Sequence, residues 1–179
     1  MRHLPIILLY SLFPFFAQAQ NPDARYTDLE QVLGSKQAEA HETVTALFEM
    51  ARLYRQKAFE RYNPDTAYTY LREGQRHYRK LNKRDQKRVD RAGYEPREMR
   101  DLRAELREEG LAFKLQESTS QAMLDYMEHY SRLPHELEEK AMAAYLRMRY
   151  DELKVAMDYD SLKQFSIDYD QALKEYLPG

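Results

Sequence analysis

The chain of 179 residues contains no cysteine, no tryptophan and only five glycines. Without cysteine, no disulfide framework can hold the fold together, and no thiol can act as a nucleophile or carry a lipid after a signal sequence. The scarcity of glycine goes with the absence of both glycine-rich phosphate-binding motifs, the P-loop and the dinucleotide fingerprint. We therefore expect a protein that is stabilised by packed side chains and is not a lipoprotein.

The motifs of metal-dependent and serine hydrolases are missing too. No Gly-x-Ser-x-Gly occurs, and the stretches that begin at His41 and His135 lack the second histidine of a zinc-binding His-Glu-x-x-His. His129 and His135 flank Pro134, but histidines in a turn between helices more often form caps or contact water than bind a metal ion. The aspartates within residues 158–170 lack the glycine and the spacing of a calcium loop. The sequence predicts no catalytic residue, no metal site and no cofactor, so we expect a protein that is not an enzyme.

Residues 1–19 have the pattern of a secretory signal peptide. A basic start at Arg2 precedes an apolar stretch over residues 4–16, and Ala-Gln-Ala at residues 17–19 forms a small-x-small cleavage site. The apolar stretch is shorter than the roughly 20 residues of a membrane span, although retention as a single membrane anchor is the alternative. We expect cleavage before Gln20 and an exported protein, periplasmic or secreted, without a transmembrane span.

The charge of the whole chain does not favour a polyanion as partner. Lysine and arginine together number 28 against 30 aspartates and glutamates, which gives a formal net charge of −2. Residues 76–103 are the exception, with 11 basic and five acidic side chains and with Tyr78 and Tyr94 interleaved. Export and the mixed charge argue against nucleic acid, so we expect no nucleic acid as partner. Binding of this basic segment to an anionic surface, such as lipid head groups or an acidic glycan, stays open as an alternative.

Hydrophobic periodicity predicts helices throughout the mature chain. Apolar residues recur at intervals of three and four over residues 44–54, and no stretch alternates apolar and polar residues for long enough to form a strand. Asn63 and Thr119 are N-cap residues, and Pro64 and Pro96 stand where a helix begins. The sequence therefore predicts an all-α protein.

The predicted helices come in pairs, which indicates a repeat. Residues 106–134 fit the tetratricopeptide pattern, in which small and large apolar residues recur at fixed places in two helices. The matching residues are Leu106, Gly110, Phe113, Ala122, Tyr126 and Pro134, while Glu109 stands where the pattern has leucine. The chain resembles tetratricopeptide-repeat (TPR) proteins, of the irregular exported type found in bacterial cell envelopes.

The resemblance implies a short right-handed solenoid of antiparallel helix pairs. It assigns residues 20–39 to a leader or linker with room for one short helix, and residues 40–179 to the TPR-like helical domain, with pairs at about 40–81, 97–133 and 135–176. The first pair fits best in its first helix, and the third fits poorly. Gly110 and Ala122 would allow two helices to approach closely, with large rings beside them.

The same resemblance implies where a partner would bind, because the first helices of successive pairs line a concave groove in such proteins. The candidate groove residues are Phe48, Arg52, Arg55, Arg107, Leu111 and Lys114. The remaining positions carried over are Thr45, Ala104, Ala143, Leu146, Tyr150 and Leu153. Basic side chains with apolar neighbours suit an acidic, partly apolar segment of another protein. We expect a non-catalytic protein–protein interaction scaffold or adaptor in the cell envelope; the alternative is a terminal fragment or structural part of a larger envelope repeat assembly.

Overall fold

The computed structural model describes residues 21–156 and 159–176, and it is all-α in these ranges. No strand occurs among these residues, which confirms the predicted fold class. The predicted signal peptide, residues 1–19, lies outside the described residues. The helices are α1 (Pro22–Gly34), α2 (Ala40–Tyr54), α3 (Pro64–Tyr78), α4 (Lys83–Arg91), α5 (Pro96–Leu115), α6 (Ser120–His129), α7 (His135–Val155) and α8 (Tyr159–Tyr176).

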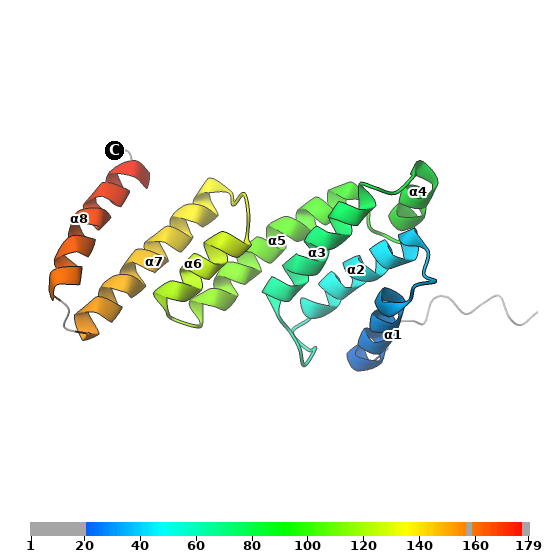
Figure 1. Cartoon of the computed structure of the whole chain (residues 1–179), viewed down its shortest axis with the longest axis horizontal. Helices are drawn as coiled ribbons and strands as arrows, with labels where there is room; N and C mark the ends of the chain where they lie inside the picture. The colour runs from blue at the N-terminus through cyan, green and yellow to red at the C-terminus, as the bar shows by residue number, and fades with distance from the viewer. Residues whose placement is uncertain (1–20, 157–158, 177–179) are drawn as a thin grey trace, which may run out of the picture.

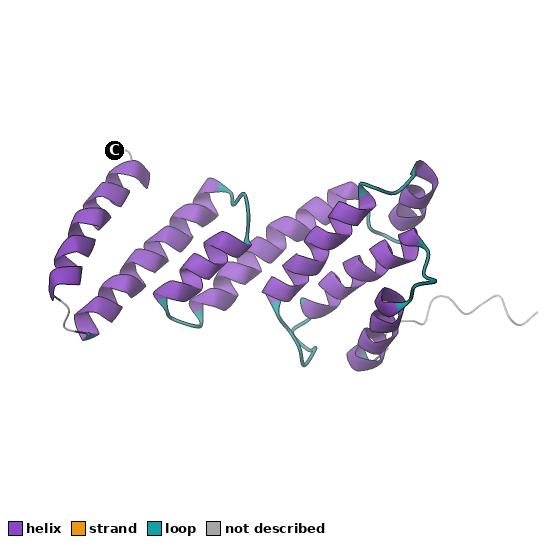
Figure 2. Ribbon diagram, viewed as in Figure 1, coloured by secondary structure: helices purple, strands orange, loops and turns teal. Residues whose placement is uncertain are grey.

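The helices follow one another in an elongated row, with α1 and α4 near one end and α8 at the other (Figure 1). Helix α2 packs against α1 and α3, and α3 packs against α5. From α5 onward, α5 packs against α6, α6 against α7, and α7 against α8. Loops connect the helices at the margins of the row (Figure 2). Within the part of the chain that the structure describes, no helix is both long enough and apolar enough to cross a membrane.

Side-chain caps fix where several helices begin. The Asn63 side chain accepts a hydrogen bond from the Thr66 amide at 2.9 Å, and Thr119 caps α6 through the Ala122 amide. These two predicted starts are confirmed. Asn82 caps α4, the short helix within the polar connection, and Gly93 adopts a φ of 85° just after α4 ends. That left-handed conformation is favourable for glycine because it has no Cβ atom.

Aromatic rings occupy the centre of the main hydrophobic core, which runs from α2 to α7. Tyr68, Tyr126 and Tyr130 are fully buried, and the ring of Tyr130 lies 4.4 Å from that of Tyr68 and 4.8 Å from that of Tyr126, centroid to centroid. Such ring contacts add to the free energy that comes from burying apolar area. A second, smaller cluster joins α1, α2 and Phe59 of the following loop.

Glycines allow rings to approach two of the helices closely. A Cβ atom on Gly74 would lie 2.6 Å from Phe48 Cε1, and a Cβ atom on Gly110 would overlap the phenol of Tyr130. The sequence analysis expected Gly110 to admit a neighbouring helix, with the rings of Phe113 and Tyr126 beside it; the group that fills the space at Gly110 is the ring of Tyr130. Phe113 is half-buried and meets Tyr62 edge-on, at 6.0 Å between ring centroids.

Candidate functional site

The candidate groove residues do not share one surface. Arg52 of α2 and Arg55, the C-cap residue of α2, form ion pairs with one side of α5, whereas Arg107 and Lys114 lie on the other side of that helix. The separation follows from helix geometry, because Glu105 and Arg107 are two residues apart and so point about 200° apart around the axis.

Two of the candidates belong to the core. Phe48 is 1% exposed and stacks on Tyr94, and Leu111 is 6% exposed. Neither side chain is available to a partner. The apolar element that the sequence analysis assigned to the groove is used for packing instead, because burial of these side chains stabilises the fold.

The remaining carried-over positions are divided between core and surface. Leu146 and Leu153 are buried, whereas Ala104, Ala143 and Tyr150 are exposed. The Thr45 hydroxyl donates to the backbone carbonyl of His41 at 2.9 Å. These positions therefore form no continuous surface with the arginines of α2.

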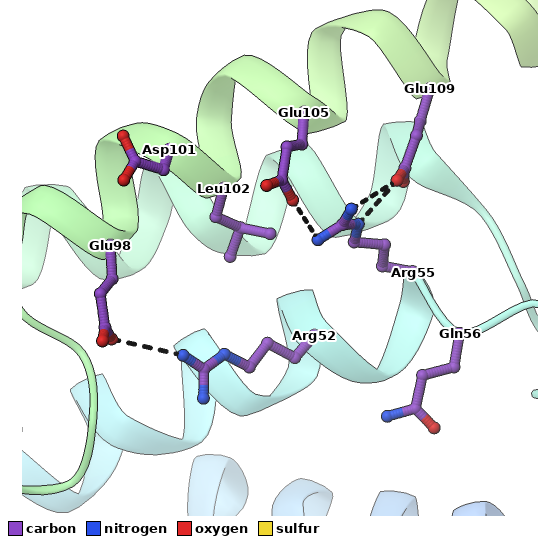
Figure 3. A pocket seen from close by; sticks show the side chains of 8 residues that line it. All are labelled: Arg52, Arg55, Gln56, Glu98, Asp101, Leu102, Glu105 and Glu109. Atoms are coloured by element: carbon purple, nitrogen blue, oxygen red, sulfur yellow. Dashed lines mark hydrogen bonds and ion pairs between the residues drawn. The ribbon is translucent and has the colours of Figure 1, made fainter.

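A groove between α2 and α5 contains the two arginines of α2, and its own carboxylates neutralise them (Figure 3). Arg55 Nη1 lies 2.5 Å from Glu105 Oε2, and Arg55 Nε donates to Glu109 Oε1 at 2.8 Å. The hydrogen bond with Glu109 is the main reason why the pKa of Arg55 is raised. Its charge is thus already compensated within the fold.

Arg52 is also held by its own chain. Its Nη2 atom donates to the Gly93 carbonyl at 2.9 Å and lies 3.6 Å from Glu98 Oε2. Its guanidinium carbon lies 4.4 Å from the centroid of the Tyr94 ring, within the range of a cation–π contact. Since four carboxylates (Glu98, Asp101, Glu105 and Glu109) face two arginines, the formal charge of this lining is −2, the opposite of the basic groove that the sequence analysis expected.

A second concave surface carries the positive charge. We call it the arginine groove: it is lined by Arg72 and Arg76 of α3, its C-cap residue Arg79, Arg103 of α5 and Arg132 of the α6–α7 connection. Glu73 is the only acidic side chain in its lining, so five arginines and one glutamate give a formal charge of +4. The other lining residues are Thr69, Gln75 and Ser131.

Most of these arginines have no counter-ion. Arg76 lies 3.7 Å from Glu73, but Arg72, Arg79 and Arg132 form no ion pair with any residue of the described ranges. The sequence analysis missed this surface, although a signal was present. Residues 72, 76 and 79 are spaced by four and three, which places their side chains on one face of a helix.

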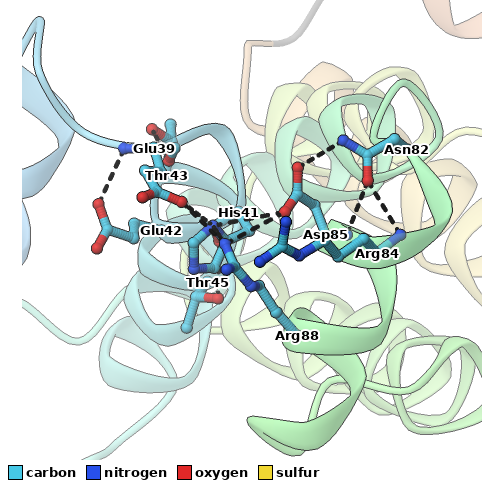
Figure 4. A network of polar contacts seen from close by, with 9 residues as sticks. All are labelled: Glu39, His41, Glu42, Thr43, Thr45, Asn82, Arg84, Asp85 and Arg88. Carbon is cyan, nitrogen blue, oxygen red and sulfur yellow. Dashed lines mark hydrogen bonds and ion pairs between the residues drawn. The ribbon is translucent and has the colours of Figure 1, made fainter.

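The basic segment 76–103 contributes to two different surfaces. Its residues 76, 79 and 103 belong to the arginine groove, while α4 presents Lys83, Arg84, Lys87, Arg88 and Arg91 around a smaller hollow. Figure 4 shows that Arg88 turns toward α2, where its Nη1 atom lies 2.9 Å from Glu39 Oε2. His41 approaches the same Glu39 oxygen, at 3.2 Å. Arg88 thus fastens α4 to α2.

The histidines near Pro134 are engaged separately. His129 Nε2 lies 3.0 Å from the Asp65 carbonyl oxygen, whereas exposed His135 lies 3.5 Å from Glu139 on its own helix. No group of three or more metal-ligating side chains comes together in the described part of the chain.

Comparison with protein-family models, with curated proteins and with solved structures finds no match for this chain. Its function has to be argued from its own surfaces.

Proposed function

We propose that the protein is a non-catalytic scaffold of TPR-like helix pairs, exported from the cytoplasm, that binds an acidic segment of a partner protein in the arginine groove. The observation that carries the proposal is the formal charge of +4 on one concave surface. The row of helices and the close approaches at Gly74 and Gly110 support a solenoid of helix pairs. The partner class is the one that the sequence analysis expected, but the binding surface is a different one.

Electrostatics explains why this groove suits an acidic segment better than the α2–α5 groove does. In the α2–α5 groove a carboxylate of the partner would have to displace Glu105 or Glu109 from Arg55 and would meet repulsion from the others. In the arginine groove, Arg72, Arg79 and Arg132 are free to form charge-assisted bidentate hydrogen bonds with incoming carboxylates. Arginine is the side chain best suited to such forked contacts.

The test uses residues 20–179 and a fluorescent peptide rich in glutamate, with binding followed by anisotropy. The groove variant combines Arg72→Gln with Arg132→Asn, where asparagine suits the positive φ of 56° at position 132. The matched control combines Lys83→Gln with Lys87→Gln on α4, two exposed side chains without ion pairs among the described residues. Both double variants remove two positive charges.

We expect the groove variant to weaken binding by at least about tenfold, which is the effect of losing a single charge-assisted hydrogen bond, and the control to change it little. Binding by the parent protein should also fall as salt is added, because the groove acts through screened charges. Equal weakening in both variants, or no binding by the parent protein, would contradict the proposal.

The basic face of α4 favours one further candidate, contact with an anionic surface. Lys83, Arg84, Lys87 and Arg91 project from one short helix without neutralising carboxylates among the described residues. Vesicles that contain phosphatidylglycerol test this candidate. Vesicle binding that is lost in the α4 variant and kept in the groove variant would favour it.

The far end of the row supports the assembly alternative. Val155, Tyr159 and Ile167 are 83%, 77% and 54% exposed, which is unusual for apolar side chains on neighbouring helices. A larger repeat assembly would cover them. Sedimentation of residues 20–179 across a range of concentrations tests whether copies of the chain do so.

A further inference from the structure

Arg103, which lines the arginine groove, has a buried side-chain nitrogen without a partner, and so does Arg107, which bonds to Ser131 of the same lining. The Nε atoms of Arg103 and Arg107 and the hydroxyl of Tyr68 are buried and form no hydrogen bond in the described structure. Tyr68 itself is completely buried. Buried donors nearly always have partners, and an unmade hydrogen bond of this kind costs free energy. These atoms are closed to a ligand, but they show that the guanidiniums of Arg103 and Arg107 keep their charge without a full set of acceptors.

The surroundings of Arg103 disfavour its positive charge. Burial lowers the pKa of Arg103, and the nearby charges of Arg107, Arg79 and Arg72 lower it further, while Tyr68 acts in the opposite direction. Among the described residues, Arg103 forms no ion pair with a carboxylate, and its one side-chain hydrogen bond goes to neutral Gln75. The positively charged guanidinium of Arg103 therefore has no carboxylate as counter-ion among the described residues.

Neutral oxygens fix the orientation of both guanidiniums, which are only partly buried. Arg103 Nη2 donates to the side-chain oxygen of Gln75, and Arg107 Nη2 donates to the Ser131 carbonyl at 2.8 Å. Gln75 is itself fixed, because its Nε2 atom donates to the Met99 carbonyl at 3.2 Å. Acceptors of this kind position a guanidinium without cancelling its charge, so the charge remains available to a ligand.

We infer that the arginine groove contains a subsite for a multiply charged tetrahedral oxyanion, a phosphate or sulfate group, centred on Arg103. The inference rests on the proposed function, because the group would be an ester on the bound acidic segment. A phosphate carries close to two negative charges and three acceptor oxygens, which matches several arginines better than a carboxylate does. Exposed Arg79 and Arg132 stand at the rim, where they would contact the oxygens that point away from Arg103.

The shape of the surface decides between two sources of such a group. The subsite lies in a concavity lined by α3, α5 and the α6–α7 connection. A group that protrudes from a flexible segment can enter it, whereas the head groups of a flat bilayer cannot follow the walls of a concavity. An ester on a partner segment is therefore favoured over a lipid head group.

The experiment measures displacement of the glutamate-rich peptide from residues 20–179 by inorganic phosphate, sulfate and chloride at one ionic strength of about 0.1 M. We expect phosphate and sulfate to displace the peptide at about tenfold lower concentration than chloride. Titration calorimetry with phosphate alone measures the subsite without the peptide. Arg103→Gln should abolish the preference for phosphate, and Arg97→Gln, an exposed position on the same helix, should keep it.

The outcomes separate the two proposals. Peptide binding with equal displacement by all three anions overturns the oxyanion subsite and leaves the proposed function in place. Calorimetric binding of phosphate without any peptide binding overturns the proposed function and supports the subsite. Circular dichroism shows whether Arg103→Gln folds. If that variant does not fold, Arg79→Gln at an exposed position replaces it, and we expect the same loss of the preference for phosphate over chloride. The assignment of the subsite is overturned if the protein binds phosphatidylglycerol vesicles more tightly than a phosphorylated peptide and if Arg103→Gln binds the vesicles equally well.

Discussion

Gly110 of α5 lies directly beneath the ring of Tyr130, so closely that a Cβ atom at Gly110 would overlap the phenol. The ring is fixed on its other sides, because Tyr130 is fully buried, touches Tyr68 and Tyr126, and donates its hydroxyl to Asp65 Oδ1 at 2.8 Å. Burial raises the pKa of the Tyr130 hydroxyl, which keeps it a donor. The contact therefore joins α3, α5 and the end of α6 at one point.

Replacement of Gly110 by alanine should destabilise the protein. A methyl group at this point must displace a ring that cannot move freely, and overpacking of this kind costs about 1–3 kcal/mol. The cost outweighs the roughly 1 kcal/mol by which alanine favours a helix over glycine. Urea denaturation measures the change. Gly34→Ala is the control, because nothing lies within 4 Å of a Cβ atom there; a similar gain of stability in both variants would contradict the fixed ring.

The cap that α7 provides for α6 should make stability depend on acid pH. Glu152 accepts hydrogen bonds from the Ser120 amide and the Ser120 hydroxyl, both at 2.7 Å, and these bonds lower its pKa from the ordinary 4.5. A carboxylate with a lowered pKa stabilises the fold above its unfolded pKa and loses that effect as the pH falls through its folded value. Glu152→Gln should therefore cost about 1 kcal/mol at neutral pH and flatten the acid decline of stability.

Urea unfolding from neutral to acid pH measures this effect, and the same helix offers a control. The carboxylate of Glu136 also has a lowered pKa, because Lys140 bonds to it one turn away, but the pair is fully exposed. Glu136→Gln should leave the curve nearly unchanged, since exposed pairs contribute little. An equal effect of the two substitutions would show that the bonds to Ser120 do not cap α6.

The two arginines of the α2–α5 groove should differ in their structural importance. Arg55 is the less exposed of the two and forms ion pairs with Glu105 and Glu109. The other carboxylate oxygen of Glu109, Oε2, is buried and has no hydrogen-bond partner. Arg55→Ala leaves these carboxylates uncompensated and should cost about 1–3 kcal/mol, the desolvation penalty of an unsatisfied buried group. Arg52→Ala, at a more exposed position, should cost under about 1 kcal/mol. The reverse order in chemical denaturation would contradict this ranking.

Helix α4 depends on a single buried side chain. Val89 is the only buried residue of this nine-residue helix, and it belongs to the main core. Val89→Ala removes apolar contacts worth about 1–2 kcal/mol, so α4 should open locally more often. Hydrogen exchange should show reduced protection in α4 and unchanged protection in α6. Loss of protection to the same extent in both helices would show that α4 unfolds only with the whole protein; Lys87→Ala, at an exposed position, is the control.

The mature protein should begin at Gln20. Small side chains at residues 17 and 19 fit the subsites of a signal peptidase, and the polar chain that follows suits a free terminus. Intact-mass measurement of the exported product checks this expectation. A mass that retains Met1 in a membrane fraction would favour the anchor interpretation.

Local signals in the sequence were sufficient to predict the helices. A cap such as Asn63 acts on the amide three residues away, so its effect can be read without knowledge of the fold. The groove could not be predicted in this way. The partners of Arg55 are distant in the sequence, with Glu109 at a separation of 54 residues, and only packing decides which side of α5 faces α2. The charge of Arg55 alone therefore indicated a basic surface where the folded chain has an acidic one.

The row arrangement also has a consequence for the speed of folding. The main helix packing is between neighbours in the chain or between helices that skip one, as α3–α5, α2–α4 and α5–α7 do. Chains whose contacts are this local close only short loops before contacts form, and such helical proteins fold within microseconds to milliseconds. Each helix can thus pack against its neighbour as soon as both have formed. Structure can therefore grow progressively along the row from α1 onward.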